Sequence, residues 1–90
     1  MVIYRILLSK KSYKFLGEVD RELNLRIIRE VSDLENFPFL SMPHDLAKLK
    51  DRKNYYRLRV GDVRIIFKID KPAKTIYVEK IGYRKVIYKQ

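Results

Sequence analysis

Four arginines in the second half of the chain are the side chains best suited to binding a phosphate group. Arg57 and Arg59 are two positions apart, so they point to the same face if this stretch is a strand. Arg64 follows the turn at 61–62, and the sequence leaves open the hairpin register that decides whether it shares that face. Arg84 follows the last long run of strand-forming residues. Because guanidinium groups stay charged and bind phosphate bidentately, such a cluster makes a phosphate site without a glycine-rich loop.

Lysines and tyrosines surround these arginines in the sequence. Aromatic rings set among cations suit single-stranded RNA, whose unpaired bases can stack on them. Tyr55, Tyr77, Tyr83 and Tyr88 are the rings in question. We therefore take the following residues as candidates for RNA binding: Lys48, Lys50, Arg52, Lys53, Lys68, Tyr83 and Lys85.

The positive charge of the chain is concentrated in one half. Of the 90 residues, 21 are Lys or Arg and 11 are Asp or Glu, which gives a net charge of +10. Residues 1–45 hold seven basic and seven acidic side chains, whereas residues 46–90 hold fourteen and four. A field of one sign attracts polyanions and destabilises the fold by self-repulsion. The charge thus indicates nucleic acid, or an acidic protein, as a partner.

Composition excludes several other kinds of site. The chain has no cysteine, which excludes a disulfide scaffold, a cysteine zinc site and a cysteine nucleophile. Its one histidine, His44, excludes a metal site built on a histidine pair, and three glycines are too few for a phosphate-binding glycine loop. We expect no metal and no cofactor. No apolar run approaches the roughly 20 residues of a membrane span, and the N-terminus resembles a strand rather than a signal peptide, so we expect a cytoplasmic protein.

The first half of the chain predicts a strand followed by a helical hairpin. Residues 2–8 are β-branched and aliphatic, which is typical of a strand. Ser9 is a suitable N-cap, and apolar residues then recur every three or four positions from Leu16 to Leu34. Gly17 is the natural place for a break, with Asp20 as a second N-cap. Prolines at 38 and 43 end the helical stretch, and residues 36–45 form a loop in this prediction.

After that loop the apolar period changes from 3.6 to two. Residues 46–49 predict one further helical turn, residues 54–60 and 63–69 a β-hairpin with one apolar and one basic face, and residues 75–81 another strand. Residues 84–88 predict a short final strand. The order β-α-α-β-β-β within one domain, residues 1–90, predicts an α+β fold: an N-terminal strand, a helical hairpin, and an antiparallel sheet with the helices on one face.

Three segments together resemble a known family. They are Lys48-Leu49-Lys50, the stretch Tyr55-Tyr56-Arg57-Leu58-Arg59-Val60-Gly61-Asp62-Val63-Arg64-Ile65-Ile66-Phe67, and the tail Val78-Glu79-Lys80-Ile81-Gly82-Tyr83-Arg84-Lys85-Val86-Ile87-Tyr88. In this order and at these spacings they resemble the RelE/ParE toxin superfamily, nearest its RelE side. With the expected N-terminal strand and helical hairpin, the resemblance covers essentially the whole chain.

The resemblance implies a function as the toxin of a type II toxin–antitoxin pair. RelE-like members cut messenger RNA in the ribosomal A site without a metal and so inhibit translation. The implied partners are the ribosome, messenger RNA and a cognate RelB-like antitoxin, with no membrane involved. Two other interpretations of the function stay open: a ParE-like topoisomerase poison, and a noncatalytic basic module that acts as corepressor with its antitoxin.

The same resemblance implies roles for single residues. Arg64 and Arg84 match arginines that hold the scissile phosphate, Tyr88 matches a C-terminal tyrosine assigned to proton transfer or stacking, and Arg57 and Arg59 fall where some members carry a basic pair. Tyr83 replaces the histidine that many relatives have before this arginine.

Proton transfer is the step of this chemistry for which the candidate residues are least suited. Tyrosine and lysine have ordinary pKa values near 10 and 10.4, and surrounding cations lower them. Tyr88 is therefore the leading acid or base, with Tyr83 and Lys85 behind it. The ordinary pKa of histidine suits acid–base chemistry near neutral pH. His44 lies beside Pro43 in the loop, however, so a capping or packing role is the better interpretation.

Overall fold

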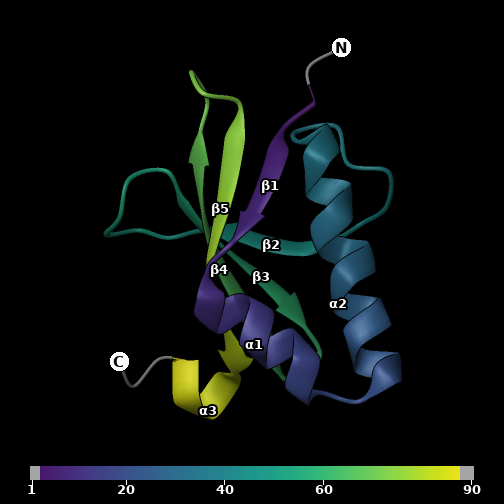
Figure 1. The fold of residues 1–90 in the computed structure, drawn as a ribbon. Coiled ribbons are helices and arrows are strands. Elements are labelled where there is room, and N and C mark those ends of the chain that lie inside the picture. Colours follow the sequence, from purple (N-terminus) through teal and green to yellow (C-terminus); the bar gives the residue numbers. More distant parts are fainter. Residues whose placement is uncertain (1–2, 88–90) are drawn as a thin grey trace.

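The computed structural model describes residues 3–87, and Figure 1 shows their arrangement. A strand comes first, two helices follow it, and the remaining strands come after them. The elements are β1 (Arg5–Leu8), α1 (Lys10–Glu18), α2 (Arg21–Asp33), the 3-10 turn η1 (Leu34–Asn36), β2 (Asp45–Lys48), β3 (Tyr55–Val60), β4 (Val63–Asp70), β5 (Thr75–Tyr83) and α3 (Arg84–Ile87). The predicted α+β class is confirmed.

Both helices begin at the predicted caps. The Ser9 side chain accepts a hydrogen bond from the Ser12 backbone N–H at 3.1 Å, and Asp20 accepts one from Leu23 N–H at 2.8 Å. Each cap satisfies a backbone donor that the first turn of a helix leaves unpaired. Asn24 of α2 then donates to the Leu16 carbonyl of α1 at 2.7 Å, which joins the two helices across the turn.

The five strands form one sheet in the order β1-β5-β4-β3-β2. All neighbours are antiparallel except β1 and β5, which run parallel. The predicted hairpin of β3 and β4 is confirmed, and Gly61 turns it with a φ of +60°, a left-handed conformation that glycine adopts without strain. The N-terminal strand thus closes one edge of the sheet, and β2 closes the other.

Helices α1 and α2 cover one face of the sheet, as predicted (Figure 1). Ile27 and Leu34 from the helical segment pack with Leu58, Ile65 and Phe67 from the sheet, and all five are fully buried. Burying such a side chain contributes about 1.5–3 kcal/mol. This core fixes which face of each strand points inward, and so which side chains the opposite face presents.

Two predicted elements at either side of the hairpin are wrong. Residues 45–48 are a strand and not a helical turn, because Leu46 pairs with Leu58 and follows the same two-residue alternation as β3. Residues 84–87 are a short helix and not a strand, because the chain folds back and places Ile87 against Gly82, where a Cβ would lie 3.4 Å from Ile87 Cδ1.

Two strand limits also differ from the prediction. β1 begins at Arg5 because the preceding residue, Tyr4, donates its backbone N–H to Glu35 at 2.9 Å instead of to a strand. β5 continues to Tyr83. Among residues 3–87, the structure has no helix that is both long and apolar enough to cross a membrane.

Candidate functional site

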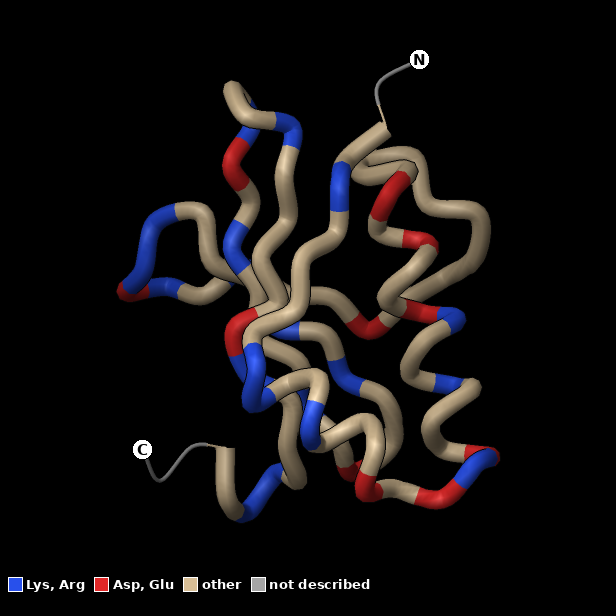
Figure 2. Tube along the Cα trace, in the orientation of Figure 1, with Lys and Arg blue, Asp and Glu red and all other residues tan. Residues whose placement is uncertain are grey.

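The sheet face opposite α1 and α2 carries three of the predicted arginines, Arg57, Arg59 and Arg64, and we call it the open face. Figure 2 shows basic segments gathered along the strands and loop of the second half, whereas α2 mixes both signs. Strand alternation and register place these residues on the open face: Tyr55, Arg57, Arg59, Arg64, Ile66, Lys68, Tyr77 and Lys80.

The register of the β3–β4 hairpin brings three of the predicted arginines together. Arg59 and Arg64 are direct Cα partners, so Arg64 shares the face of Arg59, which the sequence left undecided. Arg57 lies two residues along β3, opposite Ile66. Like charges directly opposite each other are unfavourable across a sheet. The arrangement therefore needs an anion nearby, either from the protein or from a ligand.

Asp45 at the start of β2 supplies that anion within the protein. Its Oδ1 lies 3.5 Å from Arg57 Nη2 and its Oδ2 lies 3.1 Å from Arg59 Nε. Sequence analysis missed Asp45 because residues 46–49 looked helical, although the alternation of Asp45 and Ala47 with Leu46 is the signal of a strand. An exposed pair of this kind contributes only about 0–1 kcal/mol. A phosphate oxygen can therefore compete with Asp45 for both guanidinium groups.

The guanidinium of Arg57 is incompletely satisfied. Its Nε is buried and has no hydrogen-bond partner within the described residues. Leaving such a donor unpaired costs about 1–3 kcal/mol. A small movement of Arg57 toward a bound anion would give this nitrogen an acceptor.

Arg64 is the most buried of the arginines, with 6% of its surface exposed. Its Nη1 donates to the Gly61 carbonyl at 2.7 Å and to its neighbour Val63 at 3.2 Å. These bonds hold the β3–β4 turn, so Arg64 has a structural role in addition to any contact with a ligand. Removing its side chain would disturb the turn as well as the charge.

Arg84 lies beside the same turn, at the start of α3. Its backbone N–H donates to Asp62 at 2.8 Å, and a hollow of about 390 Å³ is lined by Asp62, Tyr83, Arg84 and Lys85. Tyr83 packs edge-on against Phe15 of α1, with the ring centres 5.4 Å apart, so it leaves the open face. Tyr83 is nevertheless half exposed at the hollow, beside Arg84.

A second cluster lies farther along the open face. Tyr55 donates its hydroxyl to Glu79 Oε2 at 2.7 Å, and the Arg52 guanidinium lies 3.7 Å from the centre of the Tyr55 ring. The hydrogen bond to Glu79, together with burial and the negative charge of Glu79, raises the pKa of Tyr55. The phenol therefore stays protonated, and Glu79 is a carboxylate that sequence analysis did not single out.

Comparison with known proteins identifies the family of the chain. A family model described as the ParE toxin of type II toxin–antitoxin systems, parDE, matches residues 6–88. The chain is also 32% identical to Toxin RelE3 of Methanocaldococcus jannaschii, over 93% of this chain and 94% of the relative. It belongs to the RelE/ParE superfamily of type II toxins.

Solved structures agree with this membership. The chain is similar to the RelB–RelE antitoxin–toxin complex from Methanococcus jannaschii, at 31% identity and a TM-score of 0.75, covering 92% of this chain and 95% of that one. It is similar to the archaeal RelE–RelB complex from Pyrococcus horikoshii at 27% identity and a TM-score of 0.79, covering 96% and 99%. The isolated E. coli RelE toxin shares the fold at 12% identity and a TM-score of 0.75, over 96% and 92%.

The remaining candidates of this RelE-like chain are distributed unevenly. Lys68 lies half-buried on the open face, whereas Lys48 pairs with Tyr56 and points to the other side of the sheet. Lys50 and Lys53 are exposed in the β2–β3 loop, and Lys85 is exposed on α3. Tyr88, the leading acid or base, lies outside the described residues. Within residues 3–87, no group of three or more histidine, cysteine or acidic side chains is placed to hold a metal ion.

His44 lies away from the arginines of this RelE-like chain, in contact with α2. Its Nδ1 lies 2.9 Å from Glu30 and its Nε2 lies 2.7 Å from Asp33, and its side chain is fully buried. Burial lowers the pKa of His44, but the hydrogen bonds that its ring makes to the carboxylates of Glu30 and Asp33, with their negative charges, outweigh burial and raise it overall. His44 is thus a structural group that anchors the loop to α2.

Proposed function

We propose that this RelE-like chain is a cytoplasmic endoribonuclease that cuts messenger RNA in the ribosomal A site and so inhibits translation. One observation carries the proposal: Arg57, Arg59 and Arg64 lie together on an open sheet face, and Arg84 lies beside the turn that joins the strands. Four cations converging on one region suit a phosphate whose negative charge grows during reaction.

The arginines match the charge requirements of metal-free RNA cleavage. The 2′-oxygen forms a bond to phosphorus, the bond from phosphorus to the 5′-oxygen breaks, and the two protons move from the 2′-hydroxyl to a base and from an acid to the 5′-oxygen. The phosphate carries extra negative charge in between. Arg57 and Arg84 are the best placed to bind it, since Arg57 has an unpaired nitrogen and Arg84 is exposed at the hollow.

Proton transfer in this proposal falls to the C-terminal segment. Tyr88 stays our leading acid or base, with Tyr83 and Lys85 as the alternatives beside Arg84. Tyr83 and Lys85 line the hollow with Arg84, so either of the two can approach a phosphate held there. Tyr88→Phe keeps the ring and removes only the hydroxyl, so single-turnover cleavage by this variant separates proton transfer from stacking. A loss of about 10²–10⁴ in rate is expected if the phenol transfers the proton.

An antitoxin is the proposed protein partner. The structures of RelE–RelB complexes similar to this chain contain an antitoxin, and we propose a cognate RelB-like antitoxin here. With a net charge of +10, the toxin should attract an acidic segment of that antitoxin to its basic half. Bound there, the antitoxin would keep the open face away from RNA.

Primer extension on messenger RNA after induction of the toxin in a bacterial or archaeal host tests the proposed function. Wild type should stop protein synthesis and leave new 5′ ends inside coding regions. Arg84→Ala should abolish both, whereas Arg21→Ala, which removes the same charge from exposed α2, should leave both intact. Continued translation with accumulating DNA damage would instead indicate a topoisomerase poison, as the ParE description of the family model allows.

A further inference from the structure

The Arg52–Tyr55–Glu79 cluster is not used by the cleavage chemistry above. Arg52 lies over the Tyr55 ring, with its guanidinium carbon 3.7 Å from the ring centre, and its Nη2 is 3.9 Å from Glu79 Oε1. Tyr55 in turn donates to Glu79 Oε2. A ring, a carboxylate at its edge and a planar cation over its face are therefore already assembled on the open face.

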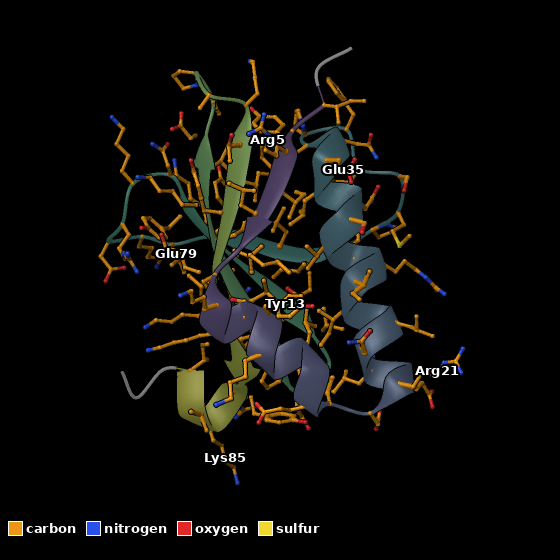
Figure 3. The ribbon with its side chains drawn as sticks, viewed as in Figure 1. Arg5, Tyr13, Arg21, Glu35, Glu79 and Lys85 are labelled. Atoms are coloured by element: carbon orange, nitrogen blue, oxygen red, sulfur yellow. The ribbon has the colours of Figure 1, made fainter. Side chains whose placement is uncertain are left out.

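Glu79 is firmly positioned. The register of β4 and β5 shifts between Ile66 and Phe67, which leaves Glu79 in a bulge. Its carbonyl accepts a hydrogen bond from Ser9 Oγ at 2.8 Å, so the N-cap of α1 pins the bulge. Figure 3 shows Glu79 beside the strands and away from α2. Bulges commonly redirect a side chain in this way.

Arg52, in contrast, is weakly held. It comes from the loop between β2 and β3, and its side chain is 48% exposed. A separation of 3.9 Å from Glu79 is beyond hydrogen-bond range, and an exposed ion pair of this kind contributes about 0–1 kcal/mol. The group that covers Tyr55 is thus exchangeable, whereas Tyr55 and Glu79 are joined by a hydrogen bond of 2.7 Å.

A nucleobase meets the same requirements as the Arg52 guanidinium. Both are planar, both stack on an aromatic ring, and both can present N–H groups to a carboxylate. Guanine carries two adjacent donors, N1–H and N2–H, on its Watson–Crick edge, whereas adenine, cytosine and uracil each place an acceptor beside their donor. A carboxylate accepts only, so it favours guanine.

We infer that Tyr55 and Glu79 form a binding subsite for a guanine base of single-stranded RNA, which Arg52 occupies in the free protein. The inference rests on the proposed RNA-directed function and adds a base preference to it. Tyr55 and Arg57 are two residues apart on β3, about 7 Å along the strand. A base on Tyr55 therefore places its own backbone next to the arginine cluster.

Binding of short RNAs to the purified full-length chain, without ribosomes, tests the subsite. The probes are fluorescently labelled, 2′-O-methylated hexauridylates in which one central base is guanine, inosine, adenine or cytosine, because methylation prevents cleavage. In low salt, the guanine probe should bind about tenfold more tightly than the adenine or cytosine probe, since a good bidentate pair discriminates by about 1–3 kcal/mol. Inosine lacks the 2-amino group and should fall between them.

Variants separate the two parts of the subsite. Glu79→Gln should make the guanine and adenine probes bind equally, whereas Asp51→Asn, the same charge change in the neighbouring loop, should keep the preference. Tyr55→Leu should weaken all probes, and Tyr55→Phe should keep their affinity because it retains the ring. Arg52→Ala should preserve the order of the probes.

The inference is wrong if wild type shows no preference for guanine, if the preference survives Glu79→Gln, or if no probe binds measurably. Its failure is separable from failure of the proposed function. A toxin that cuts messenger RNA on ribosomes but binds all probes equally contradicts only the guanine subsite. Guanine-selective binding by a chain that never cuts messenger RNA contradicts only the proposed cleavage.

Discussion

His44 and Asp45 are neighbours in the chain, yet they lie on opposite faces of the sheet. The His44 ring contacts two carboxylates, whereas the Asp45 carboxylate contacts two guanidinium groups. The His44 side chain is fully buried between Glu30 and Asp33, next to the helices. The Asp45 side chain is 54% exposed between Arg57 and Arg59, on the open face. One peptide bond thus separates a structural ion cluster from a candidate binding site.

Burial explains the different consequences of these two clusters. Asp33 accepts hydrogen bonds from Ser41 N–H at 2.9 Å, from the Ser41 hydroxyl at 2.6 Å and from Asn36 at 3.1 Å, besides its contact with His44. Those bonds lower the pKa of Asp33 far below its ordinary value, with the Ser41 hydroxyl as the largest cause. Water can replace the partners of Asp45 but not those of Asp33. The buried cluster around His44 therefore stabilises the fold, whereas another anion can replace Asp45 beside Arg57 and Arg59.

Removing Asp33 should produce the largest change in stability. Asp33→Ala leaves His44 buried beside Glu30 alone and the Ser41 and Asn36 donors unpaired. Breaking a buried charge pair costs about 3–5 kcal/mol, which urea unfolding would measure. Exposed Glu18→Ala should stay within about 0.5 kcal/mol of wild type. An equal effect of the two variants would contradict the structural role of the buried cluster.

Removing Arg57 should have the opposite profile. Arg57→Ala eliminates a buried unpaired nitrogen, so its free energy of unfolding should change little. Its rate of messenger RNA cleavage on programmed ribosomes should fall by about 10²–10³, as for the loss of one donor to a developing charge. Arg29→Ala on exposed α2 provides the matched charge control. Normal cleavage by a correctly folded Arg57→Ala protein would remove Arg57 from the proposed site.

The buried cluster should also make stability depend on pH. Because the pKa of His44 is raised in the folded protein, its contribution is fully present below its ordinary value of 6.5 and is lost as pH rises through the folded value. Asp33 stays ionised over this range, and Glu30, 3.9 Å from Arg26, is the other facing group. Thermal unfolding between pH 6 and 9 should show this decline in wild type. His44→Gln should show less of it, and identical slopes would exclude His44 as the cause.

Asp45 should give the smallest effect. Asp45→Asn removes an exposed ion pair, so the free energy of unfolding should change by less than about 1 kcal/mol. Freed from that carboxylate, Arg57 and Arg59 should bind a single-stranded RNA about fivefold more tightly, the equivalent of about 1 kcal/mol. Fluorescence anisotropy at fixed salt measures this. Unchanged affinity would mean that Asp45 and RNA do not share the two arginines.

Local rules predicted most of the fold. The caps at Ser9 and Asp20 and the alternation in residues 54–69 depend on neighbouring residues alone, so they were readable from the sequence. The errors at residues 45–48 and 84–87 concern segments whose conformation is set by distant partners, namely Leu58 for the first and Gly82 for the second. A four-residue apolar segment carries too little periodicity to overrule such contacts.

The candidate site was predictable in its cations but not in its anions. Arg57 and Arg59 share a face because strand residues two apart always do, whereas the pairing of Arg59 with Arg64 required the register. Asp45 and Glu79 reach the open face only through an edge strand and a bulge, which depend on long-range pairing. The acidic side chains Asp45 and Glu79 were therefore the part of the site that the sequence did not predict.

The parallel pairing of β1 with β5 has a consequence for how the toxin folds during its synthesis. Arg5 pairs with Thr75, and the Ser9 hydroxyl bonds to Glu79, 70 residues away. Contacts between such distant residues make folding slow, because the loop between them must close before they form. During synthesis, β1 is made well before β5, the strand with which it pairs. We expect the chain to acquire its folded open face only after β5 has been synthesised.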